Sequence, residues 1–192
     1  MSLLRSRDNP RVRRCHALAR DSRTRRAEAS ALIEGPHLLA AYLESGARPR
    51  AVLVSESGKA QEEIADLVRR AGVAPVTLPD TLFRWVADAA TPVGIAAEIT
   101  IPSAAALPAS AGDCVFLENV QDAGNVGAIL RSAAAFGLRH AVLSQGCADP
   151  WSPKVLRAAM GGHFALAITE AEDLAAVLGS FTGTLVCTVV QG

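Results

Sequence analysis

Arg131 is the residue of this sequence whose surroundings most suggest chemistry. It stands within a run of small and apolar residues, 126–135, whose spacing predicts a helix, and a polar loop, 118–124, comes directly before that helix. A guanidinium group beside a polar loop could bind a phosphate or a ribose. It could equally reach solvent along its aliphatic stem or pair with Asp122. The spacing alone leaves both interpretations open.

The neighbouring elements predict how Arg131 would be positioned. Residues 115–117 and 141–143 are short apolar runs of the kind that form buried strands, and Gly137 is suited to end the helix between them. A strand, a loop, a helix and a second strand in this order are typical of a parallel α/β sheet. Because such sheets bind ligands at the carboxyl ends of their strands, we expect residues 118–125 to lie at a binding edge.

The rest of the chain continues this alternation and predicts an α/β protein with two domains. Four apolar strands separated by helices are expected between residues 30 and 101. Residues 102–112, with the sequence PSAAALPASAG, are the predicted linker, which places an N-terminal domain at 1–101 and a second domain at 113–192. The apolar run 185–190 predicts a buried strand, so we expect the second domain to be incomplete and to continue beyond residue 192.

Charge is distributed unevenly along the chain. The formal net charge is zero, yet residues 1–26 contain nine arginines against two acidic residues, Asp8 and Asp21. We expect this segment to form a basic helix that is broken near residues 21–24. A basic arm on a mildly acidic body indicates an acidic partner, nucleic acid first. The alternative is a solvated helix without a ligand.

Several classes of protein are excluded by what the sequence lacks. The four cysteines and four histidines show no metal-ligand spacing, so no metal is predicted, and unpaired cysteines fit a reducing cytoplasm. No apolar run approaches the roughly 20 residues of a membrane span, and the arginine-rich start lacks the apolar core of a secretory signal. We therefore expect a cytoplasmic protein that does not bind membranes. The glycine fingerprint of dinucleotide sites, the phosphate loop and the G-x-S-x-G elbow are also absent.

One combination of residues is specific enough to suggest a family. It consists of Asn119, Asp122, Asn125, Gly127, Arg131, Ala133, Phe136 and Gly137, followed by Asp149, Pro153, Lys154, Arg157 and Gly161. This combination resembles the first signature motif of the SpoU (TrmH-type) RNA 2′-O-ribose methyltransferases, in the SPOUT superfamily. The start of the chain is similar to that family's RNA-binding domain, through Asn9-Pro10, the basic stretch and Glu34-Gly35.

The resemblance implies a fold, a cofactor and an assembly. The fold would be a small N-terminal α/β RNA-binding domain, followed by a mostly parallel-sheet SPOUT methyltransferase domain with a C-terminal trefoil knot. The family binds S-adenosylmethionine and forms a homodimer whose active site uses both chains. By the same resemblance Asn125 and Arg131 are the catalytic pair, and we expect Thr188, Val189 and Gly192 to face the cofactor.

The family pattern is not complete in this sequence. Ala123 stands where the family usually has proline, and Ala158 replaces a common serine. The second and third family motifs, which supply most of the cofactor pocket, are absent from the 192 residues.

The expected substrate is RNA, with ribosomal RNA ahead of transfer RNA because the N-terminal domain is present. The expected RNA contacts come from the basic arm, from the turn after the first strand and from the helix near residue 153. They are Arg11, Arg13, Arg14, Arg23, Arg25, Arg26, Glu34, Lys154 and Arg157.

The expected reaction transfers the sulfonium methyl group of S-adenosylmethionine to a ribose 2′-hydroxyl. Arg131 is the family's candidate for removing the proton, but a guanidinium stays protonated, so it could instead stabilise the oxyanion or clamp a phosphate. Two other functions stay open. One is a non-catalytic RNA-binding module that keeps the fold, and the other is a nucleotide-dependent α/β enzyme of another kind, against which the missing glycine fingerprint argues.

Overall fold

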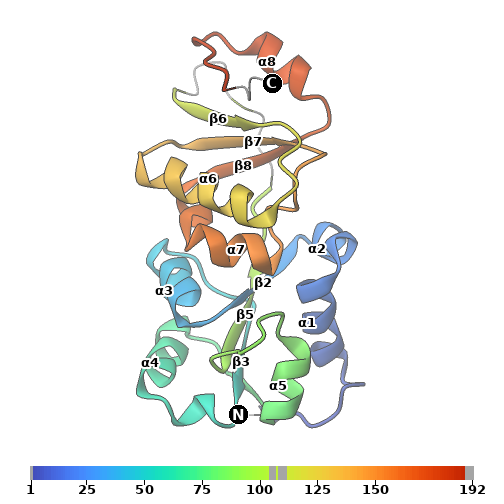
Figure 1. Ribbon diagram of the computed structural model, residues 1–192. Coiled ribbons are helices and arrows are strands. Elements are labelled where there is room, and N and C mark those ends of the chain that lie inside the picture. Colours follow the sequence, from blue (N-terminus) through green and yellow to red (C-terminus); the bar gives the residue numbers. More distant parts are fainter. Residues whose placement is uncertain (1, 104–106, 108–111, 189–192) are drawn as a thin grey trace.

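A computed structural model describes residues 2–103, 107 and 112–188 of the chain (Figure 1). The chain forms two α/β units that stack along the long axis of the molecule, one on a five-stranded sheet and one on a three-stranded sheet. The predicted α/β class is confirmed. The predicted linker falls largely on residues outside those described.

The N-terminal unit is built on a mixed sheet. Its elements are β1 (Ser2–Leu3), α1 (Pro10–Arg20), α2 (Ser22–Glu28), β2 (Ser30–Glu34), α3 (Pro36–Glu44), β3 (Ala51–Ser55), η1 (Gly58–Ala60), α4 (Glu62–Ala71), β4 (Val76–Leu78), α5 (Asp80–Val86) and β5 (Ile95–Thr100). The strand order is β1-β4-β3-β5-β2, and β5 runs antiparallel to both β2 and β3. Strands β2 to β5 are the four that the sequence predicts.

Helices cover both faces of this sheet because successive side chains of a strand point to opposite faces. Ile33 and Val52 belong to the core shared with α3 and α4, whereas Leu32 and Leu53 belong to the core shared with α1 and α5. All four side chains are buried. The central residues of these strands are therefore apolar on both faces of the sheet, as the apolar runs of the sequence indicate.

The basic arm is part of this core. Asn9 caps α1, and Asp21 lies at the boundary between α1 and α2, where its carboxylate accepts hydrogen bonds from the backbone N–H groups of Arg23 and Thr24. This cap is the predicted break near residues 21–24. Val12 and Leu18 are fully buried, so only one face of α1 meets solvent.

The second unit is a three-stranded parallel sheet with the order β6-β7-β8. Its elements are β6 (Cys114–Leu117), α6 (Ala123–Ala135), β7 (His140–Ser144), α7 (Pro153–Ala159), η2 (Gly162–Ala165), β8 (Ala167–Ala171) and α8 (Leu174–Ser180). Asp122 caps α6 through the backbone N–H of Asn125, at 2.8 Å, and Ser152 caps α7. The predicted strand, loop, helix and strand around Arg131 are confirmed.

The strand predicted at residues 185–190 is not formed in the part that the structure describes. Residues 185–188 have no strand assignment and Val186 is 87% exposed. A strand needs a neighbour to pair its backbone groups, and no described residue pairs with this segment. The prediction of a strand was wrong for residues 185–188 because it rested on apolar composition alone.

Helix α7 joins the two units. Trp151 and Leu156 belong to the same apolar cluster as Ile33 and Leu39 of the N-terminal unit. On its other side α7 packs against α6 (Figure 1). There Gly127 lies so close to α7 that an added Cβ would stand 2.8 Å from the carbonyl oxygen of Val155 and would overlap the Cβ of Ala158.

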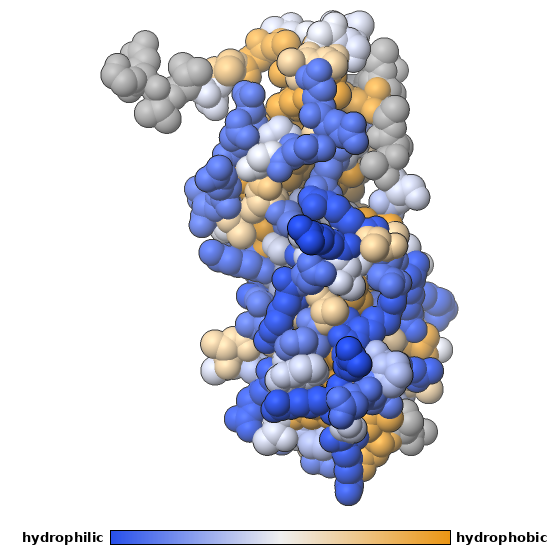
Figure 2. Space-filling model, turned by 90° about the vertical axis from the view of Figure 1, so that its right-hand side faces the viewer, coloured by the Kyte–Doolittle hydropathy of each residue, from blue (hydrophilic) through white to orange (hydrophobic). Residues whose placement is uncertain are grey.

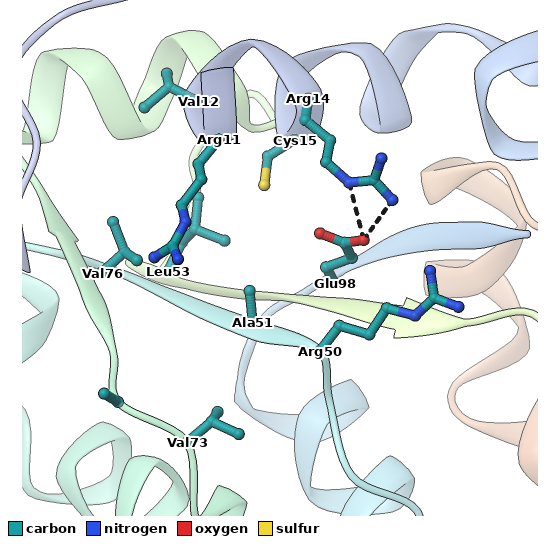
Figure 3. Close-up of a pocket in the computed structure, with 11 residues that line it drawn as sticks. Arg11, Val12, Arg14, Cys15, Arg50, Ala51, Leu53, Val73, Val76 and Glu98 are labelled. Carbon is teal, nitrogen blue, oxygen red and sulfur yellow. Dashed lines mark hydrogen bonds and ion pairs between the residues drawn. The ribbon is translucent and has the colours of Figure 1, made fainter. Parts of the chain in front are cut away.

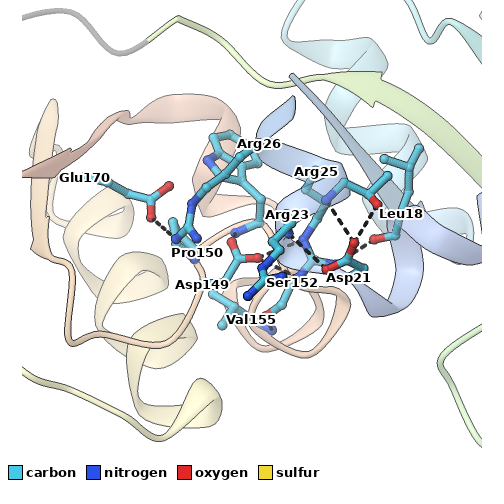
Figure 4. Close-up of polar contacts among 12 residues, drawn as sticks. Leu18, Asp21, Arg23, Arg25, Arg26, Asp149, Pro150, Ser152, Val155 and Glu170 are labelled. Carbon is cyan, nitrogen blue, oxygen red and sulfur yellow. Dashed lines mark hydrogen bonds and ion pairs between the residues drawn. The ribbon is translucent and has the colours of Figure 1, made fainter. Parts of the chain in front are cut away.

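Ion pairs reinforce the joint (Figure 4). Arg25 donates from Nε and NH2 to Asp149 Oδ2, at 2.8 and 2.5 Å, and from NH1 to the carbonyl oxygen of Leu18. The Arg25 and Asp149 side chains are only 5% and 15% exposed. Arg26 pairs with Glu170 nearer the surface. Both arginines lie on α2 and both carboxylates lie in the second unit, so the basic arm holds the units together.

Replacing Gly127 by alanine should destabilise the protein, although the same change in a helix normally favours folding. The new methyl group has no space beside α7, and overpacking of this kind costs about 1–3 kcal/mol. Urea denaturation measures the change in the free energy of unfolding. The matched control is Gly179→Ala in α8, where no atom lies within 4 Å of the added Cβ, and which should be neutral or slightly stabilising. Equal stability of the two variants would contradict this account of the α6–α7 contact.

Arg25→Ala and Arg26→Ala should differ sharply in stability, although the residues are adjacent and each loses one ion pair. Arg25→Ala leaves a largely buried carboxylate without its partner, which costs about 3 kcal/mol. Arg26→Ala removes an exposed pair and should cost less than about 1 kcal/mol. Denaturation of both variants measures the difference, and similar midpoints would show that Arg25 does not anchor the joint.

Candidate functional site

The loop predicted at the binding edge lies at the carboxyl end of β6, beside the loop that follows β7. The backbone N–H of Asn119 donates to Ser144 Oγ at 3.0 Å, and the N–H of Ala148 donates to the carbonyl oxygen of Val120 at 2.9 Å. Asn119 has a positive φ of 54°. A side chain at Gly146 would overlap the Asn119 amide. The two loops therefore form one packed edge.

Asn125 and Arg131 both lie on α6 with exposed side chains. They are six positions apart, which places them roughly 240° around the helix from each other. No hydrogen bond joins them, and Arg131 forms no ion pair within residues 2–103 and 112–188. Asp122 pairs with Lys154 instead, at 3.8 Å. The guanidinium of Arg131 thus keeps its donors for a group from outside this part of the chain.

An apolar groove runs along the face of α6 that carries Ile129 and Phe136, and Arg131 is not part of its lining. It has a volume of about 340 Å³ and includes Val115, Ile129, Phe136 and Leu138. Phe136 is 84% exposed. A large apolar side chain so far in solvent on a helix with other apolar groups is typical of a surface that contacts another molecule.

The predicted cofactor-facing residues are only partly within the described structure. Thr188 lines a cavity of about 690 Å³ between β6 and residues 181–186. Val189 and Gly192 lie outside the described residues. The cavity wall is made of glycines, threonines and apolar side chains, with Asp113 and Cys114 as further neighbours.

The predicted RNA-contacting arginines separate into two groups. Arg11, Arg13 and Arg23 are exposed and have no ion-pair partner in the described part of the chain. Arg14 instead pairs with Glu28 and Glu98, and these carboxylates raise the pKa of its guanidinium. The charges of Arg25 and Arg26 are engaged at the joint. Figure 2 shows hydrophilic side chains gathered over the face that carries α1 and α2.

Glu34 and Arg157 meet each other at the joint. The Glu34 side chain is 5% exposed and accepts the backbone N–H groups of Asp88 and Ala89 at 2.6 and 3.1 Å. Arg157 lies 3.8 Å from Glu34 and 2.7 Å from Asp88. Their role in RNA binding stays a prediction. Lys154 is exposed on the same helix, next to the loop after β6.

Two groups were missed by sequence reasoning. The first is Asp88, which lies between alanines in the segment after α5 and gives no sequence signal. The second is Glu98 with Arg50, which line a cavity in the N-terminal unit. A charged residue within the apolar strand 95–100 is unusual, and that signal could have singled out Glu98.

Two kinds of feature are missing from the residues that the structure describes. They contain no group of three or more histidine, cysteine, aspartate or glutamate side chains that could hold a metal ion. None of their helices is long and apolar enough to cross a membrane.

Each of the two units matches a known protein family. Residues 113–191 match the SpoU rRNA Methylase family, and residues 9–97 match the MRM3-like substrate binding domain. The chain is 38% identical over 166 residues to the mitochondrial rRNA methyltransferase 3A of Danio rerio, a match that covers 82% of this chain and 38% of that protein. It is 32% identical over 139 residues to the 23S rRNA (guanosine(2553)-2'-O)-methyltransferase RlmP of Bacillus subtilis (strain 168), covering 72% of this chain and 53% of that protein.

Solved structures agree on the fold. The rRNA methyltransferase from Sinorhizobium meliloti superposes with a TM-score of 0.74 at 24% identity, covering 93% of this chain and 69% of that chain. The SpoU methyltransferase AviRb from Streptomyces viridochromogenes has a TM-score of 0.76 at 21% identity, covering 89% and 65%. At these identities the likeness concerns the fold alone.

The expected cytoplasmic location is wrong by these comparisons. The Danio rerio relative is named a mitochondrial protein, and so is the Homo sapiens rRNA methyltransferase 3, which is 35% identical over 145 residues, covering 71% of this chain and 34% of that protein. Unpaired cysteines indicate reducing surroundings but do not distinguish between compartments that share them.

The chain spans less than two thirds of the length of the curated relatives named above, between 34% and 53% of each. Within that span, the two family matches follow one another along the sequence as the two units do in space. The motif on α6 and its preceding loop, the parallel sheet and both matches agree: residues 113–191 belong to the SpoU rRNA Methylase family, and residues 9–97 belong to the MRM3-like substrate binding domain.

Proposed function

We propose that this chain takes part in the methylation of a ribose 2′-hydroxyl in RNA, with ribosomal RNA as the substrate class and S-adenosylmethionine as the methyl donor. The observation that carries the proposal is the exposed guanidinium of Arg131 on α6, which has no ion-pair partner among the described residues and lies behind a packed loop at the carboxyl edge of a parallel sheet. The family match and the names of the relatives, which are rRNA methyltransferases, support it.

In this proposal Arg131 acts as a donor of hydrogen bonds. A guanidinium is protonated at any physiological pH and cannot readily accept a proton. Its planar set of N–H groups can stabilise the oxygen that becomes negative as the hydroxyl attacks, or hold the adjacent phosphate. Asn125, at the first turn of α6, offers an amide that can bind the ribose. The rigid contact of α6 with α7 keeps both side chains in place.

S-adenosylmethionine would supply the activated methyl group. The AviRb protein of Streptomyces viridochromogenes has been solved in complex with this cofactor. The cavity next to β6 fits it in chemical type, because its lining is neutral or acidic and carries no cationic side chain that would repel a sulfonium ion. Thr188, with Val189 and Gly192, is assigned to the cofactor within this proposal.

The proposal includes a homodimer and the trefoil knot of the family. Asn125 and Arg131 do not meet on one chain, and the apolar groove along α6 is open to solvent. A second copy that covers Phe136 would bury that groove and place its own polar loop near α6. Burying a phenylalanine side chain stabilises an interface by about 2 kcal/mol.

The N-terminal unit, residues 1–101, is assigned to binding the RNA, residues 102–112 to the connection, and residues 113–192 to the methyltransferase unit. The exposed, unpaired Arg11, Arg13 and Arg23 and the exposed Lys154 are the proposed phosphate contacts. Arg14, Arg25, Arg26, Glu34 and Arg157 form ion pairs within the chain, so we assign them to positioning.

A second candidate function is RNA binding without methyl transfer. It is favoured by one observation, that the exposed Arg11, Arg13 and Arg23 lie on α1 and α2 of the N-terminal unit, whereas Arg131 lies on α6 of the second unit. Calorimetric titration with S-adenosylmethionine separates the two, because a non-catalytic module should not bind it.

Arg131→Ala should lower methyl transfer in the full protein at least about 100-fold, which is the effect of removing one donor to a developing oxyanion. Transfer of a labelled methyl group to ribosomal RNA is the measurement, and binding of S-adenosylmethionine should stay within about twofold. The matched control is Arg139→Ala, an exposed arginine just beyond α6, which should keep its activity. Near-normal turnover of Arg131→Ala would rule out the assignment.

Arg13→Ala with Arg23→Ala should flatten the salt dependence of RNA binding. Each lost phosphate contact lowers the slope of log K against log salt by about 0.7–0.9. Point variants are required because a deletion of residues 1–26 would remove Val12 and Leu18 from the core. Fluorescence anisotropy at several salt concentrations gives the slope. Arg69→Ala on α4, an arginine paired with Asp66, is the control. An unchanged slope in the double variant would remove the basic arm from the RNA surface.

A further inference from the structure

A second cavity lies in the N-terminal unit, beneath α1 and above strands β3 and β4 (Figure 3). Its volume is about 440 Å³, within the range of roughly 300–1,000 Å³ that is typical of small-molecule sites. Leu53 and Val76 give it an apolar floor, and Val12 of α1 adds an apolar side chain above that floor. Arg11, Arg14, Arg50 and Glu98 also line it. None of these residues belongs to α6 or its loop.

Glu98 supplies an acceptor inside this cavity. Its side chain is 8% exposed, and both Nε and NH2 of Arg14 donate to the same oxygen, Oε1, at 3.1 and 2.8 Å. Figure 3 shows the other oxygen turned away from Arg14, toward the space beneath α1. No described residue donates a hydrogen bond to that oxygen, Oε2. It is not one of the fully buried polar atoms that lack a partner, so it opens onto the cavity that Glu98 lines, where an N–H group of a ligand can donate to it.

The rim of the cavity is cationic. Arg11 is exposed, has no ion-pair partner in residues 2–103 and 112–188, and extends from α1 over the floor near Leu53 (Figure 3). Arg50 uses Nε and NH1 for neutral oxygens, those of Thr100, Ser30 and the Glu28 backbone. Its charge is therefore not balanced by a carboxylate in the described residues.

The floor stays uncharged at neutral pH. Burial raises the pKa of the Cys15 thiol to about 12, so this residue contributes an apolar surface and no thiolate. Such a floor would not stabilise a bound free phosphate, because an apolar surface cannot replace the water molecules that the anion loses on binding. An apolar floor, one acceptor and a cationic rim together fit a flat heterocycle that carries N–H donors and is attached to a phosphate.

We propose that this cavity binds one unpaired nucleotide of the RNA. The base lies on the apolar floor, its exocyclic amino group donates to Glu98 Oε2, and the guanidinium plane of Arg11 stacks on its open face. Arg50 faces the phosphate at the rim. The proposal rests on RNA being the substrate, and it adds a site that selects an unpaired base away from the reacting ribose.

The Glu98 acceptor predicts which bases the cavity beneath α1 binds. Adenine, cytosine and guanine each carry an amino group that can donate to a carboxylate. Uracil has no amino group, and its single N3–H is flanked by two carbonyl oxygens that would face the carboxylate. Nucleotides of the first three bases should therefore bind more tightly than uridine nucleotides.

The test is a titration of the methyl-labelled chain with AMP, CMP, UMP and inorganic phosphate, followed by NMR. AMP and CMP should shift the methyl signals of Leu53 and Val76, UMP should bind about tenfold more weakly, and phosphate should leave these signals in place. Glu98→Gln, whose amide can both donate and accept, should remove the discrimination against UMP. Equal binding of UMP and AMP, or shifts with phosphate alone, would overturn the proposal.

Three variants separate the cavity from the general surface charge. Ala51→Leu fills the floor and should abolish nucleotide binding while the melting temperature is kept. Arg11→Ala, a surface change that does not depend on repacking, should weaken AMP about tenfold. Arg84→Ala removes an equally exposed charge from α5, outside the cavity, and should have no effect. AMP affinity that survives both Ala51→Leu and Arg11→Ala would contradict the site.

The same proteins distinguish this inference from the proposed function. Binding of ribosomal RNA fragments by the unaltered chain tests the RNA substrate, and its absence would count against the proposed function. If the RNA binds but AMP and CMP leave Leu53 and Val76 unaffected, the RNA substrate stands and only the nucleotide site is refuted.

Discussion

The contact of α7 with both units is the interaction on which the remaining structure depends. On one side it meets α6 at Gly127, where no side chain would fit. On the other side Leu156 enters the core of the N-terminal unit. Because the apolar core extends from one unit into the other, the two sheets are held in a fixed relative position. The loop after β6, the motif helix and the cavity beneath α1 therefore belong to one body.

Desolvation decides which arginines of the basic arm can meet a ligand. A buried guanidinium must have a carboxylate nearby, as Arg25 has in Asp149. Once paired, such a group loses most of its attraction for a further anion. Arg11, Arg13 and Arg23 stay in water without a carboxylate from the described residues and keep that attraction. The positive charge of the first 26 residues therefore has two roles. Arg25 and Arg26 hold the two units together, whereas Arg11, Arg13 and Arg23 can attract an anionic ligand. The net charge of the segment does not distinguish these two groups.

The sequence allowed the order and type of most elements to be predicted, because periodicity and caps are local signals. Asp21 and Ser152 cap helices where the sequence predicts helix starts. The mixed order of the first sheet could not be predicted, since pairing of β5 between β2 and β3 depends on contacts distant in the chain. The same limit applies to the site. Residue types indicated Arg131, but only the fold shows that Arg157 meets Glu34, and that Glu98 faces a cavity.

The exposed side chains at α6 and the enclosed carboxylate beneath α1 indicate different kinds of ligand. Arg131 on α6 and Phe136 at its end are both exposed, a charged group without an ion-pair partner among the described residues and a large apolar group in solvent. An exposed apolar group of this size is typical of a surface that contacts another molecule. Beneath α1 the acceptor is an oxygen of the largely buried Glu98 carboxylate, which lines a cavity of about 440 Å³ and can meet the polar edge of a small group. The first geometry therefore suits a macromolecular partner and the second suits a single base. Because α7 fixes their spacing, a nucleotide held at one site would restrict which ribose can reach the other.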